Sequence, residues 1–338
     1  MKRLLARIGA LFRRLLRREV EPGRFESGTA GSWHGWIASA PLVLPRREYL
    51  VYLPSGHSRW RRAPLLVLCH GCKQTPEEIA AATRITSAAD AHGWIVLLPR
   101  QKQNANPWSC WNWFDDRTAH GTGEGAILLG QIGQVLDEHR GDPGRVVLAG
   151  MSAGGALVAA AALHHAVAIR GVFVHSGLAC GAASAPATAL QVMRSGPDRD
   201  VEAMARQVRS RWTRPLSLPL CVVHGEADDV VAPVNAVALV RQFLRLNDHP
   251  AMARPLPPGA AEPATLPPAD VEMREALPGE RHVTTREWRN EGRLVVRHVS
   301  IAGLGHAWSG GDPAYAFNDP APPSATEALA RFVLDVVG

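Results

Sequence analysis

The feature that most constrains the fold of this chain is a regular alternation of short apolar runs with longer helical segments. Six runs rich in β-branched and other apolar residues, each closed by Gly or Pro, are predicted to be strands. They occupy residues 47–54, 64–71, 93–99, 145–150, 171–177 and 218–225. Several do not alternate between apolar and polar positions, which is typical of strands buried on both faces. The pattern predicts an α/β fold with a mostly parallel central sheet and helices on both of its faces.

Helical signals lie between and after these runs, at residues 75–93, 123–141, 153–166, 233–247 and 324–337. The first of these segments has Thr75 as an N-cap, Glu78 three positions later and Gly93 at its end, so we expect one continuous helix there. Residues 249–280 are rich in Pro and Ala and predict an exposed loop. The alternating residues 282–301 predict a hairpin that joins the sheet.

The positive charge of the chain is concentrated at its beginning. Seven basic residues and Glu19 within residues 1–20 account for the whole formal net charge of +6. The rest of the chain is formally neutral, so its basic pI does not indicate a nucleic-acid-binding domain. Apolar residues recur at helical spacing between the arginines, which predicts an amphipathic helix that contacts an anionic membrane or a polymer granule. The alternative is a helix docked on its own domain, or a frayed terminus.

The same segment shows neither the uninterrupted apolar core of a signal peptide nor a run long enough to span a membrane. We assign residues 1–40 to a basic N-terminal extension and residues 41–338 to one large domain.

The five cysteines are too few for a disulfide scaffold, and no pair has zinc-finger spacing. Cys69 and Cys221 stand in apolar runs and are expected in the core. Cys72 and Cys110 lie in loop-like segments, where they either form a disulfide or stay free.

Ser152 stands between glycines where a predicted strand becomes an alanine-rich helix. Residues 150–154 read Gly-Met-Ser-Ala-Gly and match G-x-S-x-G, the turn that presents a nucleophilic serine at the edge of a sheet. The alternative is that Ser152 caps the helix. Because a serine hydroxyl needs a base and a carboxylate to act as a nucleophile, residues later in the chain decide between the two.

Two later loops offer these partners in the order acid, then histidine. Asp228 follows the strand at 218–225 by three residues and is our preferred acid, whereas Asp229 is placed to cap the next helix. His306 lies in a glycine-rich loop before the last helix and is the expected general base. The oxyanion requires two N–H donors, expected from the backbone of Ala153 and from that of Cys72 or its neighbour Gly71.

Several segments together resemble the polyhydroxybutyrate depolymerase family of esterases, which are α/β-hydrolases. They are "LCHGCKQT", "SCWNWF", "GMSAGG", "VVHGEADD" and "GHAWSGG", in this order. The resemblance runs from about residue 47 to the C-terminus and implies that Ser152 is the nucleophile, Asp228 the acid and His306 the base. It also implies that Trp308, Trp111 and Trp113 line an ester-binding groove, with core packing as the alternative.

The resemblance implies a serine esterase that uses no metal or organic cofactor and hydrolyses short-chain hydroxyalkanoate polyesters or their oligomers. Feruloyl and acetylxylan esterases are similar to this family, so carbohydrate esters are the alternative substrates. A protein of another class, which coats granules or membranes through residues 1–20 without catalysis, is the third interpretation. Many family members are secreted, which favours an extracellular protein; the arginine-rich segment favours a cytoplasmic one at a granule or membrane surface.

Overall fold

The computed structural model describes residues 21–32, 46–165, 168–210, 212–213, 216–252, 265–279 and 281–338. The predicted amphipathic helix at residues 1–20 lies outside these described residues. Among the described helices, none has the length and apolar character needed to cross a membrane.

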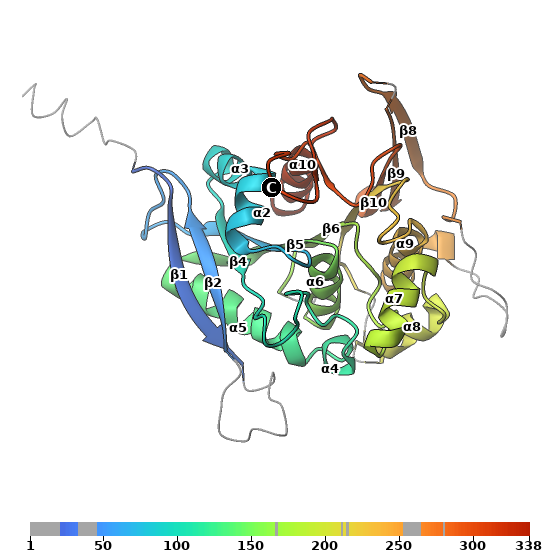
Figure 1. Cartoon of the computed structure of the whole chain (residues 1–338), viewed down its shortest axis with the longest axis horizontal. Coiled ribbons are helices and arrows are strands. Elements are labelled where there is room, and N and C mark those ends of the chain that lie inside the picture. Colours follow the sequence, from blue (N-terminus) through green and yellow to red (C-terminus); the bar gives the residue numbers. More distant parts are fainter. Residues whose placement is uncertain are drawn as a thin grey trace, which may run out of the picture.

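One large sheet forms the centre of the described structure (Figure 1). Its strands are β1 (Arg24–Gly31), β2 (Arg46–Leu53), β3 (Ala63–Cys69), β4 (Ile95–Pro99), β5 (Gly141–Met151), β6 (Gly171–His175), β7 (Leu220–Gly225), β8 (Val271–Ala276), β9 (His282–Asn290) and β10 (Arg293–Ile301). They lie in the order β1-β2-β4-β3-β5-β6-β7-β10-β9-β8. The six central strands from β4 to β10 are parallel, and the two strands at each end are antiparallel. The predicted α/β fold with a mostly parallel sheet is confirmed.

Helices cover both faces of this sheet (Figure 1). One face carries α2 (Pro76–Thr83), α3 (Ile85–His92) and α10 (Ala325–Val337). The other carries α4 (Asp116–Ala119), α5 (Gly123–Glu138), α6 (Ala153–His164), α7 (Pro186–Ser195), α8 (Val201–Arg209) and α9 (Val234–Leu246). A short turn of helix, η2 (Pro250–Met252), and a small pair of strands, β11 (Trp308–Ser309) and β12 (Asn318–Asp319), complete the described elements.

Helix α6 packs closely against the sheet. Every side chain from Ala153 to Leu163 is buried, and most of them are alanine or glycine. A Cβ atom at Gly154 would lie 2.4 Å from the carbonyl oxygen of Cys69 on β3, so only glycine permits this contact. The small residues therefore place the first turn of α6 directly against the strand ends that carry the site.

Three expectations from the sequence are wrong in detail. The helix expected over 75–93 is two helices, because Arg84 adopts a left-handed conformation (φ 53°) and its N–H closes the end of α2 on Ala81. The loop expected over 249–280 contains strand β8, which pairs with β9. Strand β1 falls inside the expected extension 1–40, but it pairs with β2 along its whole length and belongs to the domain.

Candidate active site

The carboxyl ends of five neighbouring parallel strands form one edge of the sheet. Strands β3, β5, β6, β7 and β10 are adjacent and parallel, so the loops that follow them meet at this edge. Ser152 follows β5, Asp228 follows β7 and His306 follows β10. The fold thus brings the three residues expected to act together to the same edge, which is the usual position of ligand sites in open α/β sheets.

Ser152 sits in a sharp turn between β5 and α6. Its backbone has φ 54° and ψ −123°, a conformation that non-glycine residues rarely adopt and that functional sites often hold. The N–H of Ser152 donates to the carbonyl of His175 (2.9 Å), and its own carbonyl accepts the first hydrogen bond of α6, from Ala156 (3.0 Å). Although Ser152 stands at the N-cap position, its hydroxyl makes no capping hydrogen bond. The side chain is therefore not used as a helix cap.

Asp228 and His306 are joined by a hydrogen bond. The Nδ1–H of His306 donates to Oδ2 of Asp228 at 2.8 Å, and the carboxylate is fully buried. The other oxygen, Oδ1, accepts the backbone N–H groups of Val230 (3.1 Å) and Val231 (2.8 Å). Because Nδ1 carries the proton in this arrangement, Nε2 of His306 is left as a proton acceptor. Asp229, the less favoured acid, is exposed.

Backbone contacts hold these two loops together. The N–H of Glu226 donates to Ile301 (2.9 Å), and the N–H of Ala227 donates to Leu304 (3.0 Å). The approach is so close that a Cβ atom on Gly225 would lie 2.1 Å from the carbonyl oxygen of Leu304. Glycine at position 225 is thus required for the acid loop to reach the histidine loop.

The surroundings of Asp228 keep it ionised. Burial by itself raises the pKa of this carboxyl group. Burial is outweighed by other contributions, so the pKa of Asp228 lies below its usual value. The three largest are the hydrogen bond from His306, the positive charge of His306 when it is protonated, and the hydrogen bond from the N–H of Val231. A carboxylate in this state orients the imidazole and stabilises the imidazolium that forms when His306 takes a proton.

The loop after β3 lies beside Ser152. A Cβ atom on Gly71 would be 3.4 Å from Cβ of Ser152. The N–H of Gly71 donates to Gln74 Oε1 (2.8 Å), whereas the N–H groups of Cys72 and Ala153 have no hydrogen-bond acceptor in the described parts of the chain. Of the two donors left open by the sequence, Cys72 is therefore the one whose N–H is free.

His70 holds this loop in place through hydrogen bonds. Its Nδ1–H donates to the Gly71 carbonyl (2.7 Å), its Nε2 accepts from the Gln101 N–H (3.2 Å), and its carbonyl accepts from Trp111 Nε1 (3.0 Å). Both ring nitrogens are thus used to hold the loop.

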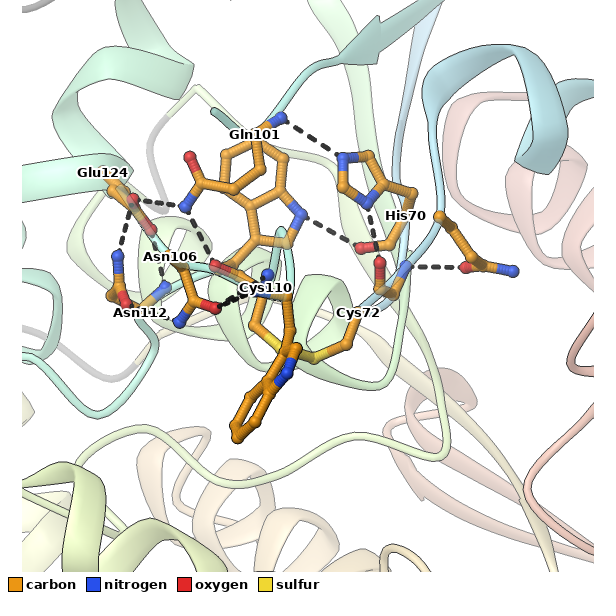
Figure 2. The surroundings of a disulfide bond; sticks show 11 residues. His70, Cys72, Gln101, Asn106, Cys110, Asn112 and Glu124 are labelled. Carbon is orange, nitrogen blue, oxygen red and sulfur yellow. Dashed lines mark hydrogen bonds between the residues drawn. A yellow bond between two sulfur atoms is a disulfide. The ribbon is translucent and has the colours of Figure 1, made fainter. Parts of the chain in front are cut away.

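A disulfide bond joins Cys72 to Cys110 (Figure 2). Of the two alternatives that the sequence left open, a disulfide or free thiols, the structure has the disulfide. The Cys110 carbonyl accepts from the side-chain amide of Gln101 (3.0 Å), which also donates to Glu124 (2.5 Å). Glu124 further accepts the backbone N–H of Asn112 (2.7 Å). The disulfide thus ties the loop that bears the free Cys72 N–H to a hydrogen-bonded network next to β4.

The three tryptophans expected to line a groove are buried. Trp308, Trp111 and Trp113 expose 1%, 2% and 6% of their surface. Trp308 donates to Thr326 (3.1 Å) and stacks on His175 with ring centroids 5.0 Å apart. Burial fits the core-packing alternative for all three tryptophans, and Trp308 contacts His175 beneath the site rather than forming an open groove wall.

Sequence reasoning missed two buried histidines next to these residues. His175 ends β6, and its carbonyl accepts the Ser152 N–H. His224 lies near the end of β7. Its Nε2–H donates to the Val231 carbonyl (2.8 Å), and Nε2 lies 3.5 Å from Asp228 Oδ2. A signal was present: the strands β3, β6 and β7 are all followed or closed by His and then Gly within two residues. Since these strands are parallel, the repeated pattern places the histidines at one edge.

Burial of neutral histidines predicts a loss of stability in mild acid. Burial lowers the pKa of His70 to about 4, and that of His175 and His298 to about 3. The unfolded chain binds these protons near pH 6.5, so the free energy of unfolding should fall as the pH drops from 6.5 toward 4, by about 1.4 kcal/mol per pH unit for each histidine. Urea unfolding at a series of pH values measures this slope.

The variant His298→Phe isolates one of these contributions. His298 lines a cavity of about 430 Å³, which gives the phenyl ring room. In this variant the slope of the free energy of unfolding against pH should decrease by the contribution of one histidine. His282 is exposed, and the control variant His282→Phe should leave the slope unchanged. An unchanged slope in His298→Phe would contradict the neutral state of the buried ring.

Comparison with known proteins agrees with this geometry. Residues 47–254 match the family described as Esterase PHB depolymerase. Poly(3-hydroxyalkanoate) depolymerase C of Paucimonas lemoignei is 29% identical over 196 residues, 57% of this chain and 46% of its own. Feruloyl esterase B of Thermothelomyces thermophilus is 27% identical over 191 residues, 53% of this chain and 64% of its own. The chain thus matches less than two thirds of the length of either relative.

The fold has a counterpart among solved structures. The acetyl xylan esterase from Aspergillus awamori superposes with a TM-score of 0.61 at 16% sequence identity, covering 77% of this chain and 88% of that one. At this identity the similarity establishes the shared α/β-hydrolase fold. The family match over more than half of the chain establishes the rest: this chain belongs to the PHB depolymerase family of esterases.

Proposed function

We propose that the protein is a serine esterase with Ser152, His306 and Asp228 as its catalytic triad. The observation that carries the proposal is the 2.8 Å hydrogen bond from His306 to the buried Asp228, at the sheet edge where the uncapped Ser152 is presented. The same three residues in the same chain order are the arrangement that this fold uses for acyl transfer.

Nε2 of His306 takes the proton of the Ser152 hydroxyl as Oγ attacks the ester carbonyl. The N–H groups of Ala153 and Cys72 stabilise the oxyanion, the first at the N-terminus of α6 and the second from the disulfide-held loop. His306 then protonates the leaving alcohol, which leaves an acyl-enzyme on Ser152. Water activated by the same imidazole releases the acid and restores the serine.

We propose a short-chain hydroxyalkanoate polyester, or its oligomers, as the substrate class. The family and the similarity to a poly(3-hydroxyalkanoate) depolymerase support it. The backbone carbonyl of Trp108 accepts the N–H of Lys73 (2.7 Å), so Trp108 lies beside the loop of Cys72. Trp108 exposes 63% of its surface, so an aromatic ring faces solvent there. Feruloyl or acetyl esters of polysaccharides are the second candidate, supported by the similarity to a feruloyl esterase.

Hydrolysis assays separate these possibilities. Wild type and Ser152→Ala are compared on p-nitrophenyl esters of graded chain length, 3-hydroxybutyrate oligomers, a polyester emulsion, and feruloyl and acetyl sugar esters. We expect wild type to hydrolyse the oligomers, and Ser152→Ala to lose at least about 10³-fold in kcat on all esters, with the exposed Ser87→Ala as the matched control. Activity on sugar esters alone would overturn the polyester assignment, full activity of Ser152→Ala would overturn Ser152 as the nucleophile, and no hydrolysis of any ester by wild type would overturn the esterase.

We also propose that the protein works in an oxidising, extracytoplasmic compartment. The Cys72–Cys110 disulfide supports this, because such bonds persist mainly outside the reducing cytosol. Contact of residues 1–20 with a membrane or granule remains a prediction from their charge and apolar spacing. A purely non-catalytic coat protein would keep its function in Ser152→Ala and lose it when residues 1–20 are deleted, the opposite of what the esterase predicts.

A further inference from the structure

The connection between β2 and β3 presents a cationic and aromatic surface to solvent. Arg59, Trp60, Arg61 and Arg62 are all exposed, and we call these four residues the cationic loop. Trp60 exposes 77% of its surface, more than the other large apolar side chains of the described residues. A ring of this size costs free energy in water, so its exposure calls for a partner surface.

Hydrogen bonds to Ser58 hold the cationic loop, and its arginines lack ion-pair partners among the described residues. The N–H groups of Trp60 and Arg61 donate to the side chain (3.2 Å) and carbonyl (3.1 Å) of Ser58, which holds the ring outward. The guanidinium of Arg59 lies 5.0 Å from the Trp60 ring centroid. Within the described part of the chain, no carboxylate forms an ion pair with any of the three arginines. Arg62 also donates to the Gly141 carbonyl (3.4 Å). The loop thus offers three positive charges, one of them stacked on an exposed aromatic ring.

The basic N-terminal segment is attached beside this loop. The described chain begins at Glu21, whose carbonyl accepts the N–H of Gly56 at 2.9 Å. Residues 1–20, which carry a formal charge of +6, therefore join the domain next to the cationic loop. Asp142, the carboxylate that the loop does influence, is paired with Arg145 (2.8 Å); this hydrogen bond and, to a smaller extent, the charge of Arg62 hold the pKa of Asp142 below its usual value.

The cationic loop and the candidate active site lie at opposite edges of the sheet. The loop leads into the amino end of β3, and Ser152 follows the carboxyl end of the parallel neighbour β5. The register pairs Ala63 with Gly141 at one edge and Cys69 with Gly150 at the other. A surface bound by the loop would thus leave Ser152 on the far side of the domain.

We propose that the cationic loop docks the protein on an anionic lipid bilayer, and that the formal charge of +6 carried by residues 1–20 adds to the same attraction. Arginine side chains are attracted to anionic headgroups, and a tryptophan ring suits the membrane interface, where one part of it is apolar and its N–H is solvated. In this orientation the edge of Ser152 faces the water. Its ester substrate is then delivered from the aqueous side, which suits a soluble oligomer or a particle and excludes the lipids of the same bilayer. This consequence rests on the proposed esterase function; the docking itself does not.

Vesicle binding of the full chain tests the proposal. Cosedimentation uses vesicles of phosphatidylcholine alone and of phosphatidylcholine with phosphatidylglycerol. We expect wild type to bind only the anionic vesicles, and the triple variant Arg59→Gln, Arg61→Gln, Arg62→Gln to bind them roughly a hundredfold more weakly. Trp60→Ala should weaken binding as well, and the indole fluorescence of wild type should shift to shorter wavelength on vesicles.

Matched variants separate a local effect from a change in net charge. The triple variant Arg194→Gln, Arg274→Gln, Arg331→Gln removes three exposed arginines elsewhere and should bind as wild type does. Trp108→Ala removes an exposed ring at the opposite edge and should also bind normally. Equal loss in both triple variants, equal binding to neutral vesicles, or no binding at all would overturn the proposal.

The orientation is tested separately from the docking. Vesicle-bound wild type should hydrolyse a soluble p-nitrophenyl ester as fast as free protein, since Ser152 faces the water. Ser152→Ala should bind vesicles normally, so failure of the esterase and failure of the docking can be told apart. Loss of soluble-ester hydrolysis on binding would contradict the proposed orientation.

Discussion

Replacing Asp228 by asparagine should lower kcat for ester hydrolysis by about 10⁴-fold while leaving the fold intact. The asparagine side chain has the same size and could still accept the N–H groups of Val230 and Val231 through its amide oxygen. Its NH₂ group would face Nδ1 of His306, however, and could only donate to it. The proton of the imidazole would then sit on Nε2, and His306 could not accept the proton of Ser152.

The measurement is steady-state hydrolysis of a soluble ester, with circular dichroism to verify folding. Asp229→Asn makes the same chemical change at the exposed neighbour and should leave kcat within about twofold, because its carboxylate does not contact His306. If Asp228→Asn kept more than a tenth of the wild-type rate, Asp228 would not be the residue that orients the base.

Removing the Cys72–Cys110 disulfide should lower kcat by about 10²-fold or more. The disulfide is the covalent tie between the network of Gln101 and Glu124 and the loop that bears the free Cys72 N–H. Loss of one oxyanion donor costs about 10²–10³ in kcat, and a loop that no longer holds its N–H in place approaches that loss. KM should change little, because the donor acts mainly on the oxyanion of the transition state.

Two measurements test this prediction: the kcat of the double variant Cys72→Ala, Cys110→Ala, and the kcat of wild type after reduction of its disulfide. The double variant is the control for effects of the reductant other than loss of the bond. Dithiothreitol should bring wild-type kcat down to the level of the double variant and should not affect the double variant itself. Assays are run below the thermal midpoint of each protein, since loss of the bond also lowers stability by a few kcal/mol. Full kcat after verified reduction would show that the bond does not position the donor.

The central strands and the order of the candidate triad could be predicted because their signals are local. Buried parallel strands are continuous apolar runs, and the turn around Ser152 requires glycines at fixed positions. The positions of Asp228 and His306 in the site could be predicted because each follows a recognisable strand. The strand before Asp228 ends at Gly225, and the one before His306 is an apolar run that ends at Ile301. Parallel topology then brings these loops to one edge without any further information from the sequence.

The remaining features depend on packing or on local conformations without a sequence signature. Residues 271–274 of β8 do alternate, but the strand is short, follows a Pro- and Ala-rich segment and is exposed at every position, so no buried face marks it; β1 is a largely polar edge strand. The break at Arg84 requires a left-handed residue, a conformation for which glycine would be the usual signal. The depth of Trp308 follows from its contact with His175, which is 133 residues away and could not be inferred from either segment alone.

The most direct test of the account is covalent labelling of the full chain by a fluorophosphonate, which reacts with activated serines. Intact-mass and peptide analysis should find one adduct per chain, on Ser152. The adduct should be absent from Ser152→Ala and should form far more slowly in His306→Ala, because the hydroxyl then has no base. Labelling that leaves Ser152 unmodified, or that proceeds equally in His306→Ala, would contradict the assignment of Ser152 as a nucleophile activated by His306.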